Sequence, residues 1–187
     1  MTLKISILGS TGSIGRSALS IVDKERKKIS VNILSANRNY NLIKKQIIKY
    51  KPKYFVISDI LIFNKIKKTF KNKKKKLINN FNSFGLNDKS DICISAIPGI
   101  AGLQPTLSLI KITKKILVAN KESIICGWSL IKKELVKYKT KIIPIDSEHF
   151  SIFQLLKNHK LEEIKKIYIT ASGGPFLNQK SKQKKNI

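Results

Sequence analysis

Short apolar segments alternate along the chain with longer segments whose apolar residues recur at helical spacing. The first apolar run, residues 3–8, leads through a glycine-rich turn into an amphipathic segment over 15–27. Short apolar runs bounded by glycine and polar residues are typical of buried strands, and a 3.6-residue period is typical of helices. The chain is therefore predicted to open with a strand, a turn and a helix.

The same alternation continues through the rest of the chain. Further strands are predicted over residues 31–35, 53–58, 92–97, 115–119, 141–145 and 164–170. Further helices are predicted over 40–50, 60–70, from about 102, 121–138 and 149–156. The lysine-rich stretch 71–76 predicts an expanded surface loop, and residues 172–175 predict a turn.

Strands separated by helical crossovers imply parallel pairing. The predicted fold class is therefore α/β, a Rossmann-like doubly wound parallel sheet followed by the start of an α/β catalytic domain. We expect residues 1–145 to form the sheet domain and residues 146–187 to begin the second domain, which stays incomplete. Such sheets bind ligands at the carboxyl ends of their strands.

Composition limits the possible classes of protein. The 187 residues are 42% hydrophobic, enough for a packed core, and no apolar stretch approaches the length of a membrane helix. The net charge of +27 would ordinarily indicate nucleic-acid binding, but the excess is almost all lysine and is spread along the whole chain. We therefore expect a lysine-rich solvated surface, no specific nucleic-acid partner and no membrane association.

The two cysteines, Cys93 and Cys126, form no CxxC motif and have no metal-ligand spacing. Two reduced thiols are typical of a cytoplasmic protein. Predicted structure starts within a few residues of the first methionine, so we expect no targeting peptide.

The turn after the first strand carries Gly9, Gly12 and Gly15 at a G-x-x-G-x-x-G spacing. Glycines allow a tight turn and a close approach of a phosphate, and the N–H groups of the helix start then point at the anion. The position between strand and helix favours dinucleotide binding over a plain tight turn.

The segment after the second strand predicts which dinucleotide binds. A carboxylate there would accept the ribose 2′-hydroxyl of NAD, but residues 35–39 contain no acid and include Arg38. A cation at this point suits the 2′-phosphate of NADP. The alternative is that Arg38 is simply a solvated side chain.

Three further motifs follow predicted strands. Residues 120–123, Asn-Lys-Glu-Ser, could hold a phosphate, a ribose or a substrate oxygen, or could be an ordinary capped helix start. Asp146 and Glu148 could turn toward one Mg²⁺ or Mn²⁺ ion, although a third carboxylate is not evident. The turn at 172–175 offers a hydroxyl and backbone N–H groups to a phosphate, or is a plain turn.

Together the motifs resemble one family, 1-deoxy-D-xylulose 5-phosphate reductoisomerase of the non-mevalonate isoprenoid route. Five stretches carry the resemblance, in family order and with family-like spacing: residues 7–15, 101–106, 119–123, 144–149 and 172–176.

The resemblance implies a role for each matching residue. The residues implied to bind NADPH are Thr11, Gly12, Ser13 and Ile14 at its phosphates, Asn37, Arg38 and Asn39 around the 2′-phosphate, and Asn120 and Glu122 elsewhere on the cofactor. The residues implied to act on the substrate are Lys121, Ser147 and Ser172, with Asp146 and Glu148 as ligands of Mg²⁺ or Mn²⁺. Lys121 and Glu148 would be the catalytic residues.

The implied reaction converts a sugar phosphate in two steps. A divalent metal chelates and polarises the substrate oxygens, the carbon skeleton rearranges to an aldehyde, and NADPH delivers hydride to give 2-C-methyl-D-erythritol 4-phosphate. The resemblance also implies a homodimer for the full-length family member.

The chain departs from the family pattern at several points. Asn37 and Arg38 stand where the family usually has glycine and lysine, and Pro98 replaces an apolar residue. The family's third metal-binding carboxylate, its active-site loop with a histidine and its C-terminal helical domain all lie further on. We therefore expect this chain to bind NADPH without turning over substrate, either as a fragment of a longer protein or as a truncated or decayed module.

Overall fold

The computed structural model of the protein describes residues 2–71, 76–85 and 87–169. The chain divides into two compact units, Met1–Asp146 and Ser147–Ile187. The first unit contains the sheet and its helices.

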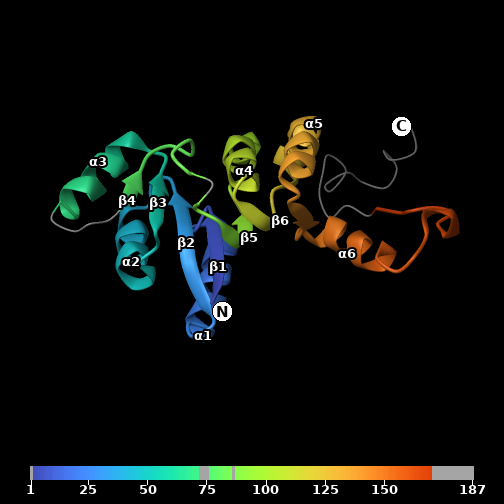
Figure 1. Ribbon diagram of the computed structural model, residues 1–187, viewed down its shortest axis with the longest axis horizontal. Coiled ribbons are helices and arrows are strands. Elements are labelled where there is room, and N and C mark those ends of the chain that lie inside the picture. The colour runs from blue at the N-terminus through green and yellow to red at the C-terminus, as the bar shows by residue number, and fades with distance from the viewer. Residues whose placement is uncertain (1, 72–75, 86, 170–187) are drawn as a thin grey trace, which may run out of the picture. The chain divides into compact units, whose positions relative to one another are not determined.

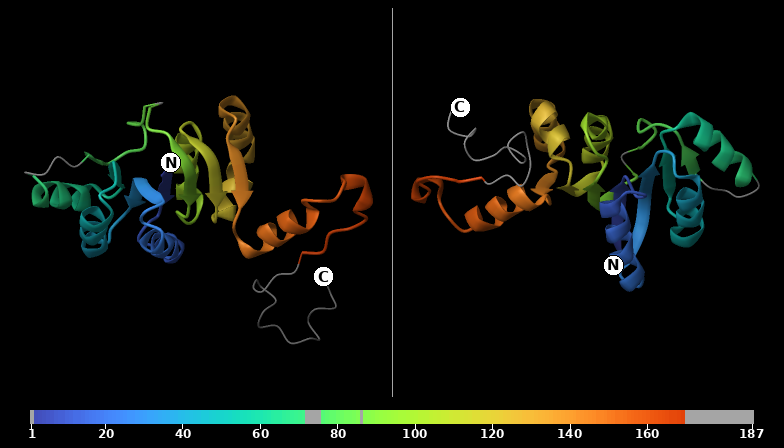
Figure 2. Two further views of the ribbon diagram at one scale, coloured as in Figure 1. Left: turned by 60° about the horizontal axis from the view of Figure 1, so that its bottom comes forward. Right: turned by 180° about the vertical axis from the view of Figure 1, so that it is seen from behind.

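Seven strands of the described chain form one parallel sheet in the order β4-β3-β2-β1-β5-β6-β7. The strands are β1 (Leu3–Leu8), β2 (Ile29–Ala36), β3 (Tyr54–Ile57), β4 (Lys76–Ile78), β5 (Ser90–Ser95), β6 (Thr113–Val118) and β7 (Lys141–Pro144). The chain builds outward from β1 to β4 on one side, returns to pair β5 with β1, and builds outward again to β7 (Figures 1 and 2). The strand order therefore reverses at β1.

Helices cover both faces of this sheet. The helices of the first unit are α1 (Ser13–Lys24), α2 (Tyr40–Tyr50), α3 (Ile60–Thr69), α4 (Leu103–Ile110) and α5 (Lys121–Tyr138), with a 3₁₀ turn η1 (Ile100–Gly102) before α4. Ile7 belongs to a core cluster that includes residues of α1, α2 and α3, whereas its neighbour Leu8 belongs to a cluster that includes residues of α4 and α5. Because successive strand residues point to opposite faces, the two clusters are the two sides of a doubly wound α/β fold, as predicted.

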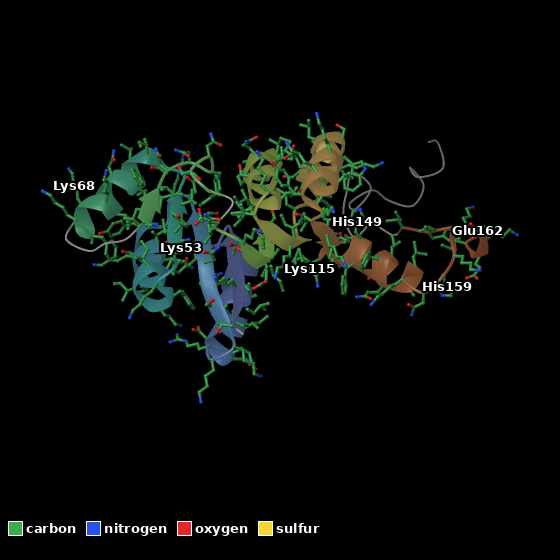
Figure 3. The ribbon with its side chains drawn as sticks, in the orientation of Figure 1. Lys53, Lys68, Lys115, His149, His159 and Glu162 are labelled. Atoms are coloured by element: carbon green, nitrogen blue, oxygen red, sulfur yellow. The ribbon has the colours of Figure 1, made fainter. Side chains whose placement is uncertain are left out.

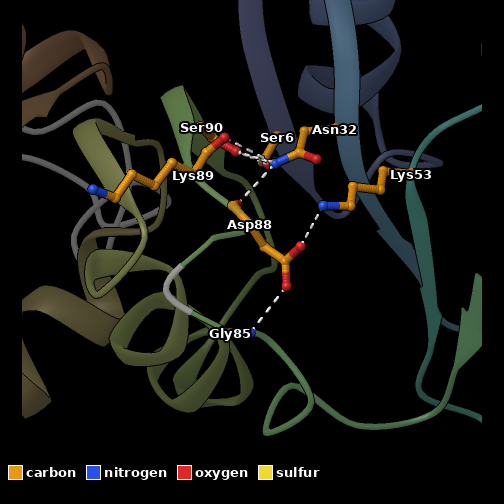
Figure 4. A network of polar contacts seen from close by, with 7 residues as sticks. All are labelled: Ser6, Asn32, Lys53, Gly85, Asp88, Lys89 and Ser90. Carbon is orange, nitrogen blue, oxygen red and sulfur yellow. Dashed lines mark hydrogen bonds and ion pairs between the residues drawn. The ribbon is translucent and has the colours of Figure 1, made fainter.

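A polar network fixes the loop before β5 at the amino edge of the sheet (Figure 4). The β1–β2 register shifts between Ile5 and Ser6, so that Asn32 has no partner on β1. The buried Asn32 amide donates to the Asp88 carbonyl oxygen (3.0 Å) and to Ser90 Oγ (2.8 Å). The Asp88 carboxylate accepts from Lys53 Nζ (2.6 Å). The register shift thus directs a polar side chain into the loop that leads to β5.

One strand was not predicted, and one predicted strand does not form. The predicted loop 71–76 is wrong at Lys76, which begins the strand β4 (Lys76–Ile78), and residues 72–75 lie outside the described residues. Strand β4 pairs with β3 through Tyr54–Val56 and half-buries Leu77 and Ile78. Residues 164–169 were predicted as most of a strand and form none, and Ile167, Tyr168 and Ile169 are exposed. An apolar sequence forms a strand only where another strand can pair with it.

The second unit contains helix α6 (Ser147–Leu156) and a 3₁₀ turn η2 (Leu161–Glu163) within its described residues. Helix α6 begins two residues before the predicted start at 149. The predicted turn at 172–175 lies outside the described residues.

Candidate functional site

A cavity of about 460 Å³ lies at the carboxyl ends of β1, β2, β3 and β5. Its lining residues are Gly9, Thr11, Gly12, Ser35, Ala36, Asn37, Ser58, Ala96, Ile97, Pro98, Ala101 and Pro105. The cavity spans the point at which the strand order reverses, where open α/β sheets bind their ligands. Its volume is within the range of small-molecule sites.

The glycine turn brings the start of α1 against the end of β1. Gly9 has a positive φ of 79°, and a Cβ at this position would lie 2.6 Å from the Ala96 carbonyl oxygen. A Cβ on Gly15 would overlap the Gly9 carbonyl oxygen. Only glycine allows both approaches. The N–H groups of the first turn of α1, which follows Gly12, are thereby placed beside the cavity that Gly12 lines.

Ser10 and Gln46 hold this turn against α2. Ser10 Oγ donates to Gln46 Oε1 (2.6 Å), and Gln46 Nε2 donates back to the Ser10 carbonyl oxygen (2.9 Å). Both residues are buried. Sequence reasoning did not single out Gln46, although a polar residue between the buried Ile43 and Ile47 on one helix face was a usable signal.

The segment after β2 carries the predicted 2′-phosphate residues. Asn37 lines the cavity, and Asn39 caps α2 by accepting from the Leu42 backbone N–H (3.1 Å). Arg38 Nε donates to Asp59 Oδ2 (3.2 Å). Arg38 was predicted from its place after the second strand, and Asn37 and Asn39 were implied by the resemblance; the Asp59 contact was not predicted.

Asp59 is the N-cap of α3, at the carboxyl end of β3. Its Oδ1 accepts from the backbone N–H groups of Leu61 and Ile62, each at 3.0 Å. The hydrogen bond from Ile62 is the main cause that lowers the pKa of Asp59 below its usual value; desolvation opposes it, and the Leu61 bond and Arg38 add to it. The carboxylate is therefore ionised beside Arg38 at neutral pH.

Asn120 joins the end of β6 to the loop that follows β5. Its buried amide donates to the carbonyl oxygens of Ile97 and Gly99 and to Ser123 Oγ, and its Oδ1 accepts from the Ser123 backbone N–H. Ser123 Oγ in turn donates to the Gly99 carbonyl oxygen (2.9 Å). Asn120 therefore holds the loop that lines the cavity, and Ser123, which sequence reasoning did not assign, shares this role.

The neighbouring motif residues are exposed. Lys121 and Glu122 lie in the first turn of α5, where the Glu122 carboxylate favours the helix dipole. Ser13 and Ile14 are exposed at the start of α1, and Thr11 is half-buried. These positions leave the side chains accessible to a ligand.

The predicted metal ligands are two residues apart in the sequence and belong to different units. Asp146 is the last residue of the first unit, and Glu148 is in the first turn of α6, where its Oε2 accepts from Ser147 Oγ (2.9 Å). Carboxylate oxygens are the type of ligand that Mg²⁺ or Mn²⁺ prefers, but two carboxylates provide fewer ligands than such an ion needs. Within residues 2–71, 76–85 and 87–169, no three His, Cys, Asp or Glu side chains form a group that could hold a metal. Ser172 lies outside the described residues.

Positive charge is spread over the first unit. Figure 3 labels Lys53, Lys68 and Lys115, which lie just before β3, in the last turn of α3 and on β6. Several lysines pair with carboxylates, as Lys49 does with Asp23 at 2.6 Å. Among the described helices, none has the length and apolar character needed to cross a membrane.

Two family models match the sequence. Residues 5–127 match 1-deoxy-D-xylulose 5-phosphate reductoisomerase, and residues 142–187 match the C-terminal domain of the same enzyme.

Curated relatives with that name include proteins of Pelagibacter ubique and Wolbachia pipientis. The Pelagibacter ubique protein is 50% identical over 188 positions, and the protein of Wolbachia pipientis subsp. Culex pipiens is 41% identical over 189. Each alignment covers 98% of this chain and 48% of the relative. The chain therefore spans about half the length of the curated relatives it matches.

Solved structures agree with this comparison. The reductoisomerase of Zymomonas mobilis in complex with NADPH is 31% identical, with a TM-score of 0.83 over 96% of this chain and 48% of that one. A DOX-P reductoisomerase in complex with NADPH, fosmidomycin and magnesium is 28% identical, with a TM-score of 0.82 over 99% of this chain and 49% of that one.

Proposed function

The chain belongs to the 1-deoxy-D-xylulose 5-phosphate reductoisomerase family, and we propose that it carries the NADPH-binding half of that enzyme. The observation that carries the proposal is the glycine cradle of Gly9 and Gly15 beside a cavity at the strand-order reversal. An added Cβ at either glycine would collide with backbone atoms and displace the turn that lies beside the cavity. The complex of the Zymomonas mobilis relative with NADPH supports the choice of ligand.

In this proposal the pyrophosphate of NADPH lies at the start of α1. Thr11, Gly12, Ser13 and Ile14 contact its oxygens, and N–H groups of the first turn of α1 donate to them. The Gly12 N–H is not among these donors, because it donates to the Gly9 carbonyl oxygen (3.1 Å). The 2′-phosphate lies between Asn37, Arg38 and Asn39, where Arg38 provides the charge and donors that a phosphate requires. Asn120 acts through the loop it holds, and Glu122 contacts the cofactor from the first turn of α5.

The substrate residues belong to the same proposal. Lys121 and Ser147 bind oxygens of 1-deoxy-D-xylulose 5-phosphate, and Ser172, which lies outside the described residues, is assigned the same role from the resemblance. Asp146 and Glu148 supply two ligands of a divalent metal, which when bound acts as a Lewis acid on the substrate. Two carboxylates do not complete such a site, so the remaining ligands come from elsewhere in the full protein.

The proposal extends to the whole protein, whose relatives are about twice as long as this chain. The whole protein converts 1-deoxy-D-xylulose 5-phosphate to 2-C-methyl-D-erythritol 4-phosphate with NADPH and Mg²⁺ or Mn²⁺, as a cytoplasmic homodimer. The 187 residues alone bind NADPH without turnover. NADPH oxidation by the chain that requires both substrate and Mg²⁺ would contradict this last statement.

Substitution of Arg38 tests the cofactor assignment. Loss of a charge-assisted contact should weaken NADPH binding by about tenfold or more in Arg38→Ala, because such contacts contribute about 1.5–3 kcal/mol. NADH lacks the 2′-phosphate, so its dissociation constant should hardly change. The measurement is a fluorescence titration of each cofactor.

Arg26→Ala is the matched control. Arg26 is also exposed and also pairs with a carboxylate, Asp23, but it lies beyond the other end of α1. Its removal should leave the ratio of the NADPH and NADH dissociation constants unchanged. Equal losses for both cofactors in Arg38→Ala would refute the 2′-phosphate role.

A further inference from the structure

We propose that Asp59 is a positioning residue that sets cofactor selectivity by orienting the guanidinium of Arg38 toward the 2′-phosphate of NADPH. This inference rests on the proposed function. Asp59 acts through Arg38 and does not itself touch the cofactor.

The Asp59 carboxylate is held in place before any ligand binds. Its Oδ1 accepts two backbone N–H groups at the start of α3, both at 3.0 Å. The preceding Ser58 donates its backbone N–H to the Ala36 carbonyl oxygen (3.1 Å), so the end of β3 is tied to the end of β2. Ser58 and Ala36 both line the cavity. The Asp59 carboxylate is thus held in place directly after Ser58, a residue that lines the cavity.

Arg38, in contrast, is a long side chain that is 80% exposed. A side chain of this kind loses up to about 2 kcal/mol of rotamer entropy when a ligand fixes it. The Asp59 contact uses Nε, the donor nearest the aliphatic stem. A phosphate would then be bound through the terminal Nη1 and Nη2 pair, which presents two parallel donors. Pre-orientation by Asp59 lowers the entropy loss at binding.

The Arg38–Asp59 ion pair is not needed for the stability of the fold. Exposed pairs of this kind contribute little to folding, and the capping role of Asp59 requires only Oδ1. Asparagine caps helices as well as aspartate does. What the carboxylate adds beyond capping is the contact of its second oxygen, Oδ2, with Arg38.

A second polar contact joins α2 to α3 and offers a control. Tyr40 Oη and Thr69 Oγ1 lie 2.9 Å apart, at the other end of α3. If the role of Asp59 were only to hold α3 against α2, loss of the Tyr40–Thr69 contact would have a similar effect on cofactor binding.

The experiment measures dissociation constants of NADPH, NADH, adenosine 2′,5′-bisphosphate and 5′-AMP for the 187-residue chain and its variants. Asp59→Asn retains a capping oxygen and replaces the charge with an amide. It should weaken NADPH and the bisphosphate by about three- to tenfold, the scale of a partly lost charge-assisted contact. NADH and 5′-AMP should stay within about twofold, because neither engages Arg38 through a 2′-phosphate. Thr69→Val should leave all four constants unchanged.

The double variant Arg38→Ala/Asp59→Asn provides the decisive comparison. If Asp59 acts through Arg38, the double variant should bind NADPH no more weakly than Arg38→Ala alone. Asp59→Ser, which also caps without charge, repeats the test if the asparagine variant melts early.

Unchanged or tighter NADPH binding in Asp59→Asn would overturn the inference, since the carboxylate would then be neutral toward the phosphate or would repel it. A full additional loss in the double variant would overturn it as well. If Arg38→Ala itself leaves NADPH binding intact, the 2′-phosphate assignment fails first. If only the Asp59 variants are silent, the proposed function stands and this inference fails.

Discussion

The close approach of Gly15 to the Gly9 carbonyl oxygen is the single-residue feature that constrains the glycine turn beside the cavity. Gly15→Ala places a methyl group against a backbone oxygen that cannot move without displacing the turn. We expect a loss of about 1–3 kcal/mol in the free energy of unfolding, the usual cost of overpacking. NADPH affinity should fall with it. Urea denaturation and NADPH titration measure the two effects.

Gly12→Ala is the control for the steric argument. Gly12 has a negative φ of −75°, and a Cβ there would lie 3.4 Å from the Gly9 carbonyl oxygen. Its stability loss should stay below about 1 kcal/mol, the scale of an altered helix cap. Similar stability losses in the two variants would show that the turn is not sterically constrained at Gly15.

The lowered pKa of Asp23 should make the stability of the folded chain depend on pH. Burial acts to raise its pKa, but hydrogen bonds from Lys49, Arg26 and Tyr50 outweigh burial and lower the pKa to about 2 from 3.8. Because the folded pKa lies below the unfolded one, the carboxylate stabilises the folded state above about pH 4 and loses this effect as the pH falls to about 2.

Asp23→Asn should therefore destabilise the chain most at neutral pH. We expect a loss of about 1 kcal/mol at pH 7 after allowance for solvent screening, shrinking to zero near pH 2. Urea denaturation across this pH range measures the difference. A difference between variant and parent that stays constant from pH 7 to pH 2 would contradict the assignment.

At the level of elements, the polar network at the amino edge of the sheet should make the stability of the fold sensitive to one buried side chain, Asn32. Asn32→Ala leaves the acceptors at Asp88, Lys89 and Ser90 without this donor. An unmet buried polar group costs about 1–3 kcal/mol, so the variant should lose about 2 kcal/mol of stability. Asn82→Ala, at an exposed position, should lose almost none. Equal stability of both variants would show that the network is unimportant.

Element type and position followed from the sequence where local signals agreed. The predicted bounds of α2, 40–50, and α5, 121–138, match the structure because each helix has an asparagine N-cap and a periodic apolar face. Strand β4 was missed because it has only three residues, directly follows a run of lysines and is defined only by its pairing with β3. Gly127 has non-helical backbone angles within α5 and lies so close to the Leu103 side chain of α4 that a Cβ would overlap it, and no local pattern reveals this contact.

For the candidate site too, local sequence patterns did not reveal contacts between residues that are distant in the chain. The glycine turn and Arg38 could be found from spacing and from their place after strands. The contacts of Gln46 and Asp59 could not, because each residue meets its partner across the fold: Gln46 is 36 residues from Ser10, and Asp59 is 21 residues from Arg38. Only the polar position of Gln46 on the apolar face of α2 was a local signal. Asn120 was identified, but its contacts with the loop after β5 came only from the structure.

For the whole molecule, the predicted cofactor residues and the predicted substrate and metal residues are distributed unequally between the two units. The sheet, both core clusters and the cavity belong to Met1–Asp146, whereas Ser147 and Glu148 belong to the second unit. Cofactor binding should therefore depend on the first unit and be insensitive to Glu148→Gln, as an NADPH titration would measure. A large loss of NADPH affinity in that variant would place cofactor contacts in the second unit.

The central claim is that NADPH binds in the cavity at the strand-order reversal, and the most direct test locates the bound cofactor. A net charge of +27 will attract any polyanion, so affinity alone is not sufficient evidence. Hydrogen–deuterium exchange with saturating NADPH should protect residues 9–15, 35–39 and 96–105 and leave the amino edge around Asn32 and Asp88 unchanged. Protection confined to lysine-rich surfaces, or none in these three segments, would contradict the account.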